Sequence, residues 1–156
     1  AHLVKLEGDA WLAPYITALS QRGIPVCAHL GLTPQSVNKL GGFKVQGRTS
    51  EQAHILLNDA QALAKAGADL LVLECVPSAL GKKISESIDI PVIGIGAGKD
   101  TDAQVLVIND ILGLTPKPPK FSKNFLTETG NIANALSQYV YDVKNGHFPS
   151  REYSFD

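Results

Sequence analysis

The sequence has little of what marks a membrane-spanning, disulfide-bonded or nucleic-acid-binding protein. It contains no methionine, one tryptophan and only two cysteines. Cys27 and Cys75 both lie in apolar runs, so we expect free buried thiols in a reducing compartment, and with them a cytoplasmic location. Fourteen Lys and Arg balance fifteen Asp and Glu, without a basic stripe, which argues against nucleic acid as a partner. No apolar run reaches the ~18 residues of a membrane span.

What is present is typical of one globular domain. Hydrophobic residues make up 44% and charged residues 19% of the 156 residues, which are ordinary values for a globular protein. This length predicts a single domain over residues 1–156 without an internal boundary. Residues 1–4 have the pattern of the middle of a strand, so we expect the chain to be part of something longer.

Short apolar segments alternate with helical patterns along the chain. We expect strands at residues 3–6, 24–28, 70–73 and 91–95. Helical periodicity predicts helices over residues 11–19, 52–66 and 132–143, with a short helix after Ser78. The predicted helix caps and ends are Asp9, Ser78 and Asn131 at amino ends, and Gly67 and Gly146 at carboxyl ends.

This alternation predicts an α/β protein with a parallel sheet and helical crossovers. The pattern alone fits either a complete doubly wound sheet or half of an eight-stranded barrel, which needs ~250 residues. The mid-strand start favours the half barrel. Residues 113–123, rich in Pro and Lys, are expected to hold a last short strand and a loop.

Glu74 ends the apolar run Leu70-Leu71-Val72-Leu73. Four apolar residues in a row predict a strand buried on both faces, and α/β enzymes place their chemistry at the carboxyl end of such strands. Burial disfavours the charged form of a carboxylate, so Glu74 is a candidate general base. The alternative is a structural role, as a cap of the next helix or a partner of a buried Lys or Arg.

Polar residues also follow the other strands. Lys5 and Glu7 are two positions apart and so lie on one face of the first strand, while His29 ends the second. A lysine there could bind a substrate carboxylate or ketone oxygen, and a neighbouring carboxylate could ligate a hard cation such as Mg²⁺. A salt bridge for Lys5 and Glu7, and a partly buried structural histidine, are the alternatives.

Two further segments and one thiol are candidates for a functional role. The glycine-rich stretch 94–98 allows close backbone approach to a ligand and would precede a helix with free N–H groups, but its spacing differs from the dinucleotide-binding fingerprint, and a tight turn explains it equally. The Gly-hinged basic loop 38–48 is either a lid or a solvated surface loop. Cys75 as a nucleophile is disfavoured because its surroundings are apolar.

Taken together, these segments resemble the ketopantoate hydroxymethyltransferase (3-methyl-2-oxobutanoate hydroxymethyltransferase) family. The matching strings run in family order across nearly the whole chain. They are Val4-Lys5-Leu6-Glu7-Gly8, Ala28-His29-Leu30-Gly31-Leu32-Thr33-Pro34-Gln35, Gly41-Gly42-Phe43-Lys44-Val45-Gln46-Gly47-Arg48, Leu73-Glu74-Cys75-Val76-Pro77, Ile93-Gly94-Ile95-Gly96-Ala97-Gly98, Pro119-Lys120-Phe121 and Tyr153-Ser154-Phe155.

The resemblance implies a (βα)8 barrel, of which this chain would be roughly the last five strands. It implies Mg²⁺-assisted hydroxymethylation of 3-methyl-2-oxobutanoate with 5,10-methylenetetrahydrofolate as one-carbon donor, in pantothenate biosynthesis, by a homo-oligomer of the decameric type. Glu74 matches the general base, Lys5 and His29 match residues that bind the keto acid, and Glu7 matches the acidic residue of the metal site. Two further metal-binding aspartates of the family would precede residue 1.

Two other functions stay open at this level. The chain could belong to a different keto-acid lyase or mutase of the same barrel superfamily, which would turn over without a folate donor. It could also be an inactive half barrel, because half of the expected substrate site lies outside these residues and one sheet edge would be unpaired.

Overall fold

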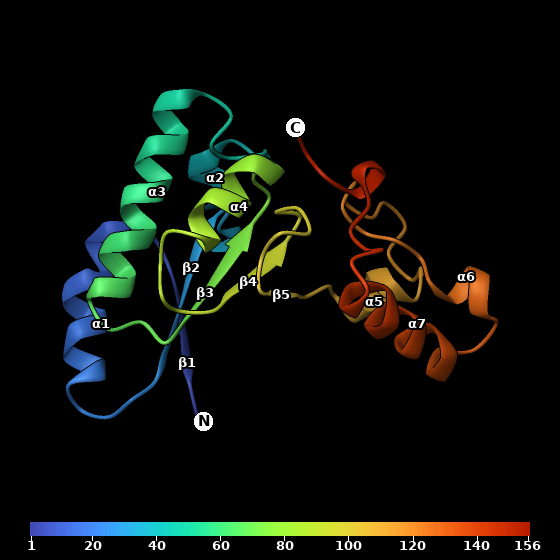
Figure 1. The fold of residues 1–156 in the computed structure, drawn as a ribbon, viewed down its shortest axis with the longest axis horizontal. Coiled ribbons are helices and arrows are strands. Elements are labelled where there is room, and N and C mark those ends of the chain that lie inside the picture. Colours follow the sequence, from blue (N-terminus) through green and yellow to red (C-terminus); the bar gives the residue numbers. More distant parts are fainter.

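The computed structural model describes all 156 residues and shows an α/β fold built on one parallel sheet (Figure 1). Helices and strands alternate as expected through the first 95 residues. The elements are β1 (Val4–Glu7), η1 (Ala10–Leu12), α1 (Ala13–Ser20), β2 (Val26–Gly31), η2 (Pro34–Ser36), α2 (Val37–Leu40), α3 (Ser50–Lys65), β3 (Leu70–Glu74), α4 (Ser78–Ser85), β4 (Val92–Ile95), β5 (Ala103–Gln104), α5 (Ile108–Ile111), α6 (Leu126–Thr129), α7 (Ile132–Lys144) and η3 (Arg151–Tyr153).

The five strands pair in chain order, β1-β2-β3-β4-β5, and every pair is parallel. A doubly wound sheet needs a point at which the strand order reverses, and this sheet has none. Pro25 and Pro91 precede β2 and β4, where their carbonyls still accept hydrogen bonds from Val4 N and Leu71 N, each at 3.0 Å. Each proline therefore lies at a position where its missing N–H removes no hydrogen bond between strands.

The two faces of the sheet have different surroundings. Helices α1, α3 and α4 lie on one side of the strands in Figure 1. In β3, Leu71 and Leu73 are buried, whereas Leu70, Val72 and Glu74 are only half-buried. Within these 156 residues the expected burial is therefore complete on one face of the strand and partial on the other, because helices cover one face fully and the other face is only partly covered.

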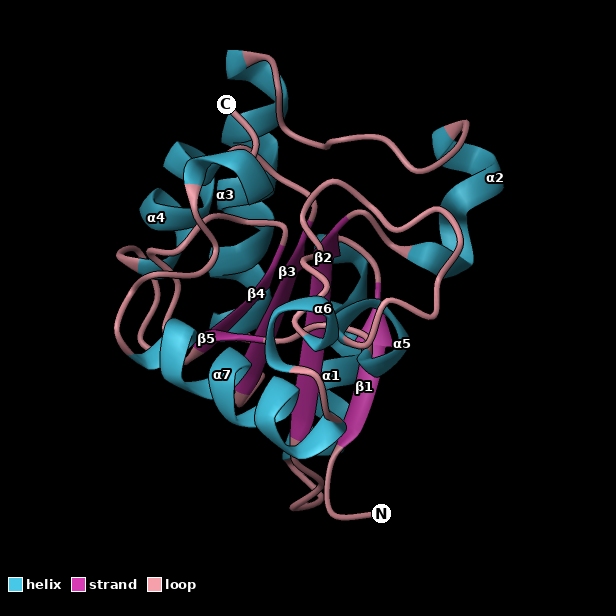
Figure 2. Cartoon of the chain, turned by 90° about the vertical axis from the view of Figure 1, so that its right-hand side faces the viewer, coloured by secondary structure: helices cyan, strands magenta, loops and turns pink.

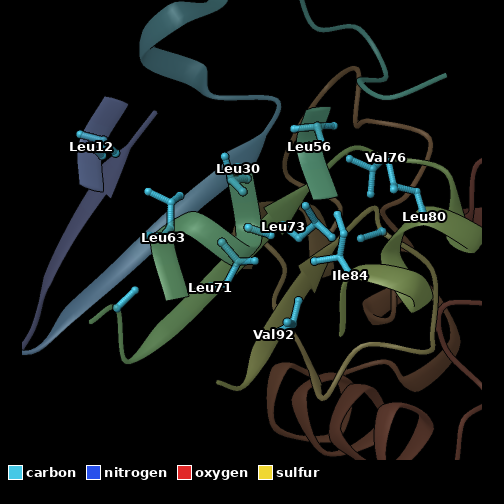
Figure 3. Packing of buried hydrophobic residues seen from close by; sticks show 14 of the residues in the cluster. Leu12, Leu30, Leu56, Leu63, Leu71, Leu73, Val76, Leu80, Ile84 and Val92 are labelled. Carbon is cyan, nitrogen blue, oxygen red and sulfur yellow. The ribbon is translucent and has the colours of Figure 1, made fainter. Parts of the chain in front are cut away.

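The main core fills the space between the sheet and these three helices, as Figure 3 shows. Leu71, Leu73 and Leu63 are at most 1% exposed, and Ile84 of α4 is fully buried. Burying side chains of this size stabilises the fold by about 1.5–3 kcal/mol each. This layer fixes the strands, and with them every residue at their carboxyl ends.

The helix boundaries confirm some of the predicted signals and correct others. Asn131 caps α7, with its Oδ1 accepting from Asn134 N at 2.9 Å. Asp9 makes no side-chain cap bond, because its helix starts as a 3-10 turn. Ser78 is the first residue of α4 rather than its cap, and its Oγ donates to Phe155 O at 3.0 Å. The sequence analysis missed the strongest cap, the Thr49 capping box that starts α3.

The carboxyl-terminal third forms a second layer on the opposite side of the sheet, with α5, α6 and α7 in front of the strands in Figure 2. Its apolar cluster includes Leu32 and Cys75 from the strand ends together with Phe121, Phe125 and Phe148. The predicted short strand in residues 113–123 was wrong: the last strand is β5, at Ala103–Gln104, and those residues form turns and loop. No helix has the length and apolar composition needed to cross a bilayer.

Candidate functional site

The carboxyl ends of β1, β2 and β3 bring an imidazole between two carboxylates. In the sheet register, Glu7 pairs with His29, and Glu74 lies one strand further on, opposite Gly31. His29 Nε2 is 3.1 Å from Glu74 Oε2, and His29 Nδ1 is 3.5 Å from Glu7 Oε1. Lys5 Nζ reaches the same Glu7 Oε1 at 3.7 Å. All four residues predicted from the sequence thus meet on the face of the sheet that points away from α1, α3 and α4.

The four side chains of this cluster differ in how deeply they are buried. The side chains of His29 and Glu7 are 2% and 6% exposed, that of Glu74 is 13% exposed, and that of Lys5 is 51% exposed. Neither ring nitrogen of His29 makes an aligned hydrogen bond despite the close carboxylates. A buried imidazole without hydrogen bonds is unfavourable in free energy unless a catalytic partner, a water or an ion completes them.

Glu7 is held from a second direction. Its Oε2 accepts a hydrogen bond from Gln35 N at 3.0 Å, so the loop after β2 fixes the carboxylate that faces His29 and Lys5. The sequence analysis did not find this contact, because a backbone N–H leaves no signal in residue type.

The backbone around Glu74 is equally constrained. Glu74 O accepts from Leu32 N at 2.8 Å, and Cys75 adopts a φ of +55°, which is uncommon for a residue other than glycine. Gly31 has a φ of +87°, and a Cβ built there would lie 2.1 Å from Glu74 O. A glycine is therefore required at this position for β2 to approach Glu74 so closely. In the sequence, the glycine at position 31 was the signal from which this close contact could have been predicted.

Residues 94–98 do not form the anion site considered from the sequence. No helix follows them, since the chain continues into β5, so the expected free helical N–H groups are absent. Instead, Gly94, Gly96 and Gly98 each leave room for one side chain: a built Cβ would meet Thr101 Oγ1 at 2.5 Å, the Phe121 ring at 2.5 Å and Ser78 Cβ at 2.6 Å. Residues 94–98 therefore form a closely packed tight turn, which was the alternative interpretation of their sequence.

Cys75 is not arranged as a nucleophile. Its thiol is free and buried. Burial, with a smaller contribution from the Glu74 charge, raises the pKa of Cys75 to about 11. Because the thiolate is the reactive form, this thiol is inert near neutral pH. Cys27 is also free and buried, and burial raises the pKa of its thiol.

The loop over residues 41–48 is attached to the body of the protein. Gln46 N donates to Cys75 O at 2.9 Å, and a Cβ on Gly47 would lie 2.4 Å from Leu80 Cδ2. Its tip is open, with Phe43 76% exposed. The short helix α2 precedes this loop, and the sequence analysis did not predict it.

Comparison with known proteins decides the family. The family model described as ketopantoate hydroxymethyltransferase matches residues 1–151. The chain belongs to the ketopantoate hydroxymethyltransferase family. Its similar relatives include proteins named 3-methyl-2-oxobutanoate hydroxymethyltransferase from Saccharophagus degradans, 64% identical over 155 residues, and from Alteromonas mediterranea and Pseudoalteromonas translucida, each 60% identical over 156 residues. These names describe a transferase family of enzymes.

The match covers nearly all of this chain but only part of each relative. Ninety-nine per cent of the chain aligns, whereas the aligned part is 57% of the Saccharophagus protein and 59% of the other two. The ketopantoate hydroxymethyltransferase relatives therefore carry additional residues that this chain does not represent.

A complete metal site is not among these residues. No group of three or more His, Cys, Asp or Glu side chains is placed to hold a metal ion. Glu7 is a hard oxygen donor of the kind Mg²⁺ prefers, but Mg²⁺ takes six ligands in near-octahedral geometry, usually including waters. Glu7 thus fits as one ligand of such an ion.

Proposed function

We propose that this chain is the carboxyl-terminal part of a (βα)8 barrel enzyme that hydroxymethylates 3-methyl-2-oxobutanoate to 2-dehydropantoate, with 5,10-methylenetetrahydrofolate as donor. The barrel is supported by the unreversed strand order and by the placement of α1, α3 and α4, the helices that connect the strands, on the same face of the sheet. It is also supported by the half-buried apolar residues on the other face, such as Val72 and Ile93, which a closed barrel would bury.

The single observation that carries the proposed chemistry is the position of Glu74. It lies on the face away from the helices, at a strand end, 3.1 Å from a buried histidine. A carboxylate that is 13% exposed, rather than fully buried, can still meet a small substrate. Proton abstraction next to a ketone needs such a positioned base, which contributes about 10²–10⁴-fold to the rate.

The proposed roles follow from these contacts. Glu74 takes the C3 proton of the keto acid, and the resulting carbanion equivalent forms a C–C bond to the methylene carbon of the donor. The two bonds between that carbon and the donor's nitrogens break, water supplies the hydroxyl oxygen of the product, and tetrahydrofolate leaves with its nitrogens protonated. Lys5, which is half-exposed at the carboxyl end of β1, binds the substrate carboxylate or ketone oxygen, while the buried His29 donates a hydrogen bond to the keto acid. Glu7 would contribute one oxygen to Mg²⁺, which when bound supplies a Lewis acid for the developing oxyanion. We also propose that the whole protein is a cytoplasmic homo-oligomer.

A chimera tests this proposal. The chain replaces the matched segment of the Saccharophagus degradans relative, which supplies the residues outside it. Exchange of the C3 proton of 3-methyl-2-oxobutanoate is then followed by NMR in deuterated water. We expect Glu74→Gln to slow exchange by about 10²–10⁴-fold.

The matched control is Glu86→Gln, on the exposed carboxyl end of α4, where the side chain is 67% exposed and 3.9 Å from Lys82. It should exchange at the unmodified rate. Normal exchange by the Glu74→Gln chimera would refute Glu74 as the base. Full product formation without any folate donor would refute the proposed reaction in favour of a different keto-acid enzyme.

A further inference from the structure

The turn that follows the proposed base connects β3 to α4. The N–H groups of Cys75 and Val76 donate to carbonyls at and just after the end of β4, at 2.8 and 3.1 Å. Pro77 has no N–H and no polar side chain, so α4 begins without a side-chain cap. The first N–H of the helix, that of Ser78, therefore needs an acceptor from another part of the chain.

That acceptor is the Phe155 carbonyl, 77 positions further along the chain. Phe155 O accepts from Ser78 N at 2.9 Å and from Ser78 Oγ at 3.0 Å. On the other side of the serine, a Cβ built on Gly98 would lie 2.6 Å from Ser78 Cβ. Ser78 is therefore held between residue 98 and the 153–155 segment, and the end of the chain lies near α4 in Figures 1 and 2.

The 153–155 segment is itself anchored to the carboxyl-terminal layer. Lys120 Nζ donates to Ser154 O and lies 5.3 Å from the centroid of the Phe155 ring. The Phe121 ring packs edge-to-face against the same ring, with 6.3 Å between the centroids. Edge-to-face packing and a cation over an aromatic face are both favourable contacts. They fix the Phe155 carbonyl at the place where Ser78 meets it.

The Phe121 ring also reaches the turn by a second route. Gly96 has a φ of +63°, and a Cβ built there would lie 2.5 Å from the Phe121 ring. Gly96 O is the acceptor for Val76 N. Between these contacts, Cys75 holds a φ of +55°, which a residue other than glycine keeps only when its surroundings determine it. The contacts of the turn supply that determination.

We propose that Ser78 is a positioning residue for Glu74, which acts by tying the turn between β3 and α4 to the 153–155 segment. This inference rests on the proposed function, in which Glu74 is the base. Ser78 acts through the backbone of the turn. Because a misplacement of about 1 Å can slow a reaction by about 10²-fold, a looser turn reduces proton abstraction. Substrate binding by Lys5 and His29, on β1 and β2, does not depend on this tie.

The chimera described above tests the role of Ser78. The rate of C3 proton exchange is measured against the concentration of the keto acid, which gives kcat and KM separately. We expect Ser78→Ala to lower kcat by about ten-fold and to leave KM unchanged, because base placement is impaired and substrate binding is not.

Ser87→Ala is the matched control. Ser87 Oγ donates to Ile84 O at 2.9 Å, at the other end of the same helix, so this variant also loses one hydrogen bond from a serine to a carbonyl. It should lower the free energy of unfolding by a similar amount but leave kcat unchanged. Stability alone therefore cannot account for a loss of kcat that is confined to Ser78→Ala.

A second variant approaches the same segment from its other side. Lys120→Met removes the donor to Ser154 O and the cation over the Phe155 ring, and should also lower kcat without changing KM. Its control is Lys117→Met, at an exposed lysine of the same loop. The Ser78→Ala, Lys120→Met double variant should lose less than the product of the two single losses, because both act through one segment.

Hydrogen–deuterium exchange of the peptide over residues 74–79, measured by mass spectrometry on the same chimeras, gives a readout independent of activity. Ser78→Ala should speed amide exchange in this turn, and Ser87→Ala should not. Equal kcat values for the Ser78→Ala and Ser87→Ala chimeras, a raised KM with unchanged kcat, or unchanged amide exchange in Ser78→Ala would overturn the assignment.

The Glu74→Gln chimera separates this inference from the proposed function. Exchange of the C3 proton that depends on Glu74 but is normal in Ser78→Ala refutes the positioning role and leaves Glu74 as the base. Normal exchange in Glu74→Gln refutes the base and the positioning role together, even if Ser78→Ala loosens the turn.

Discussion

Replacing Gly31 by alanine should damage both the stability and the site of this protein. The substitution puts a Cβ at a backbone φ of +87°, only 2.1 Å from Glu74 O and 3.1 Å from Val76 Cγ1. A left-handed conformation costs a non-glycine residue about 1–2 kcal/mol. The clash with a carbonyl oxygen cannot be relieved by a rotamer change, so β2 and β3 must separate at this end.

That separation lengthens the hydrogen bond from Leu32 N to Glu74 O, now 2.8 Å, at a net cost of about 1 kcal/mol. Together we expect Gly31→Ala to lower the free energy of unfolding by about 3 kcal/mol. Gly23→Ala is the matched control, since Gly23 has a φ of +72° but nothing within 4 Å of a built Cβ. It should lose only the conformational term of about 1–2 kcal/mol.

The measurement is denaturant unfolding of the two variants and the unmodified chain under one set of conditions, with the slopes compared to check that unfolding remains two-state. In the chimera, Gly31→Ala should also slow C3 proton exchange, because it displaces the backbone that carries Glu74. Equal losses of stability in the two variants would show that the close approach at Gly31 contributes nothing, and would refute the argument that this glycine positions the base.

Three further predictions concern two buried groups, Tyr139 and Cys75. Tyr139 packs between Phe125 and Phe148, and its buried hydroxyl has no hydrogen-bond partner. Tyr139→Phe should therefore stabilise the chain by about 1 kcal/mol in denaturant unfolding. The matched control is Tyr141→Phe, at an exposed tyrosine, which should have no effect. Burial raises the pKa of Tyr139 to about 12 from 10, so the folded state holds this proton more tightly than the unfolded state. The free energy of unfolding should therefore fall as pH rises from 10 to 12, and it should fall less steeply in Tyr139→Phe. Identical pH profiles of the two proteins would contradict this. Cys75, with a pKa raised to about 11, should be alkylated far more slowly at pH 8 in the folded chain than in denaturant, and equal rates would contradict its burial.

Much of the fold could be predicted because the signals are local. The strands at 70–73 and 91–95 were predicted to within one residue of their observed bounds, since short apolar runs bounded by Gly and Pro are typical of buried strands. The helix over 52–66 followed from its apolar stripe. The last strand was misplaced because Ala103–Gln104 is only two residues long and carries no periodicity. Its pairing with β4 depends on contacts distant in sequence.

The candidate site was predictable in its members but not in its geometry. Lys5, Glu7, His29 and Glu74 stand at strand ends, and parallel strands bring such ends to one rim. Sequence could not show that His29 lies between the two carboxylates, nor that Gln35 N binds Glu7.

The sequence by itself determined the order of helices and strands, the residues at the strand ends and the resemblance to the family, because each is carried by spacing and residue type along the chain. Only the tertiary structure decided which face of the sheet each strand-end residue occupies, how deeply it is buried and which partners it meets. The physical reason is that strand register and helix packing are set by the sum of many distant contacts, and a shift of one residue would turn Glu74 from the open face into the apolar core.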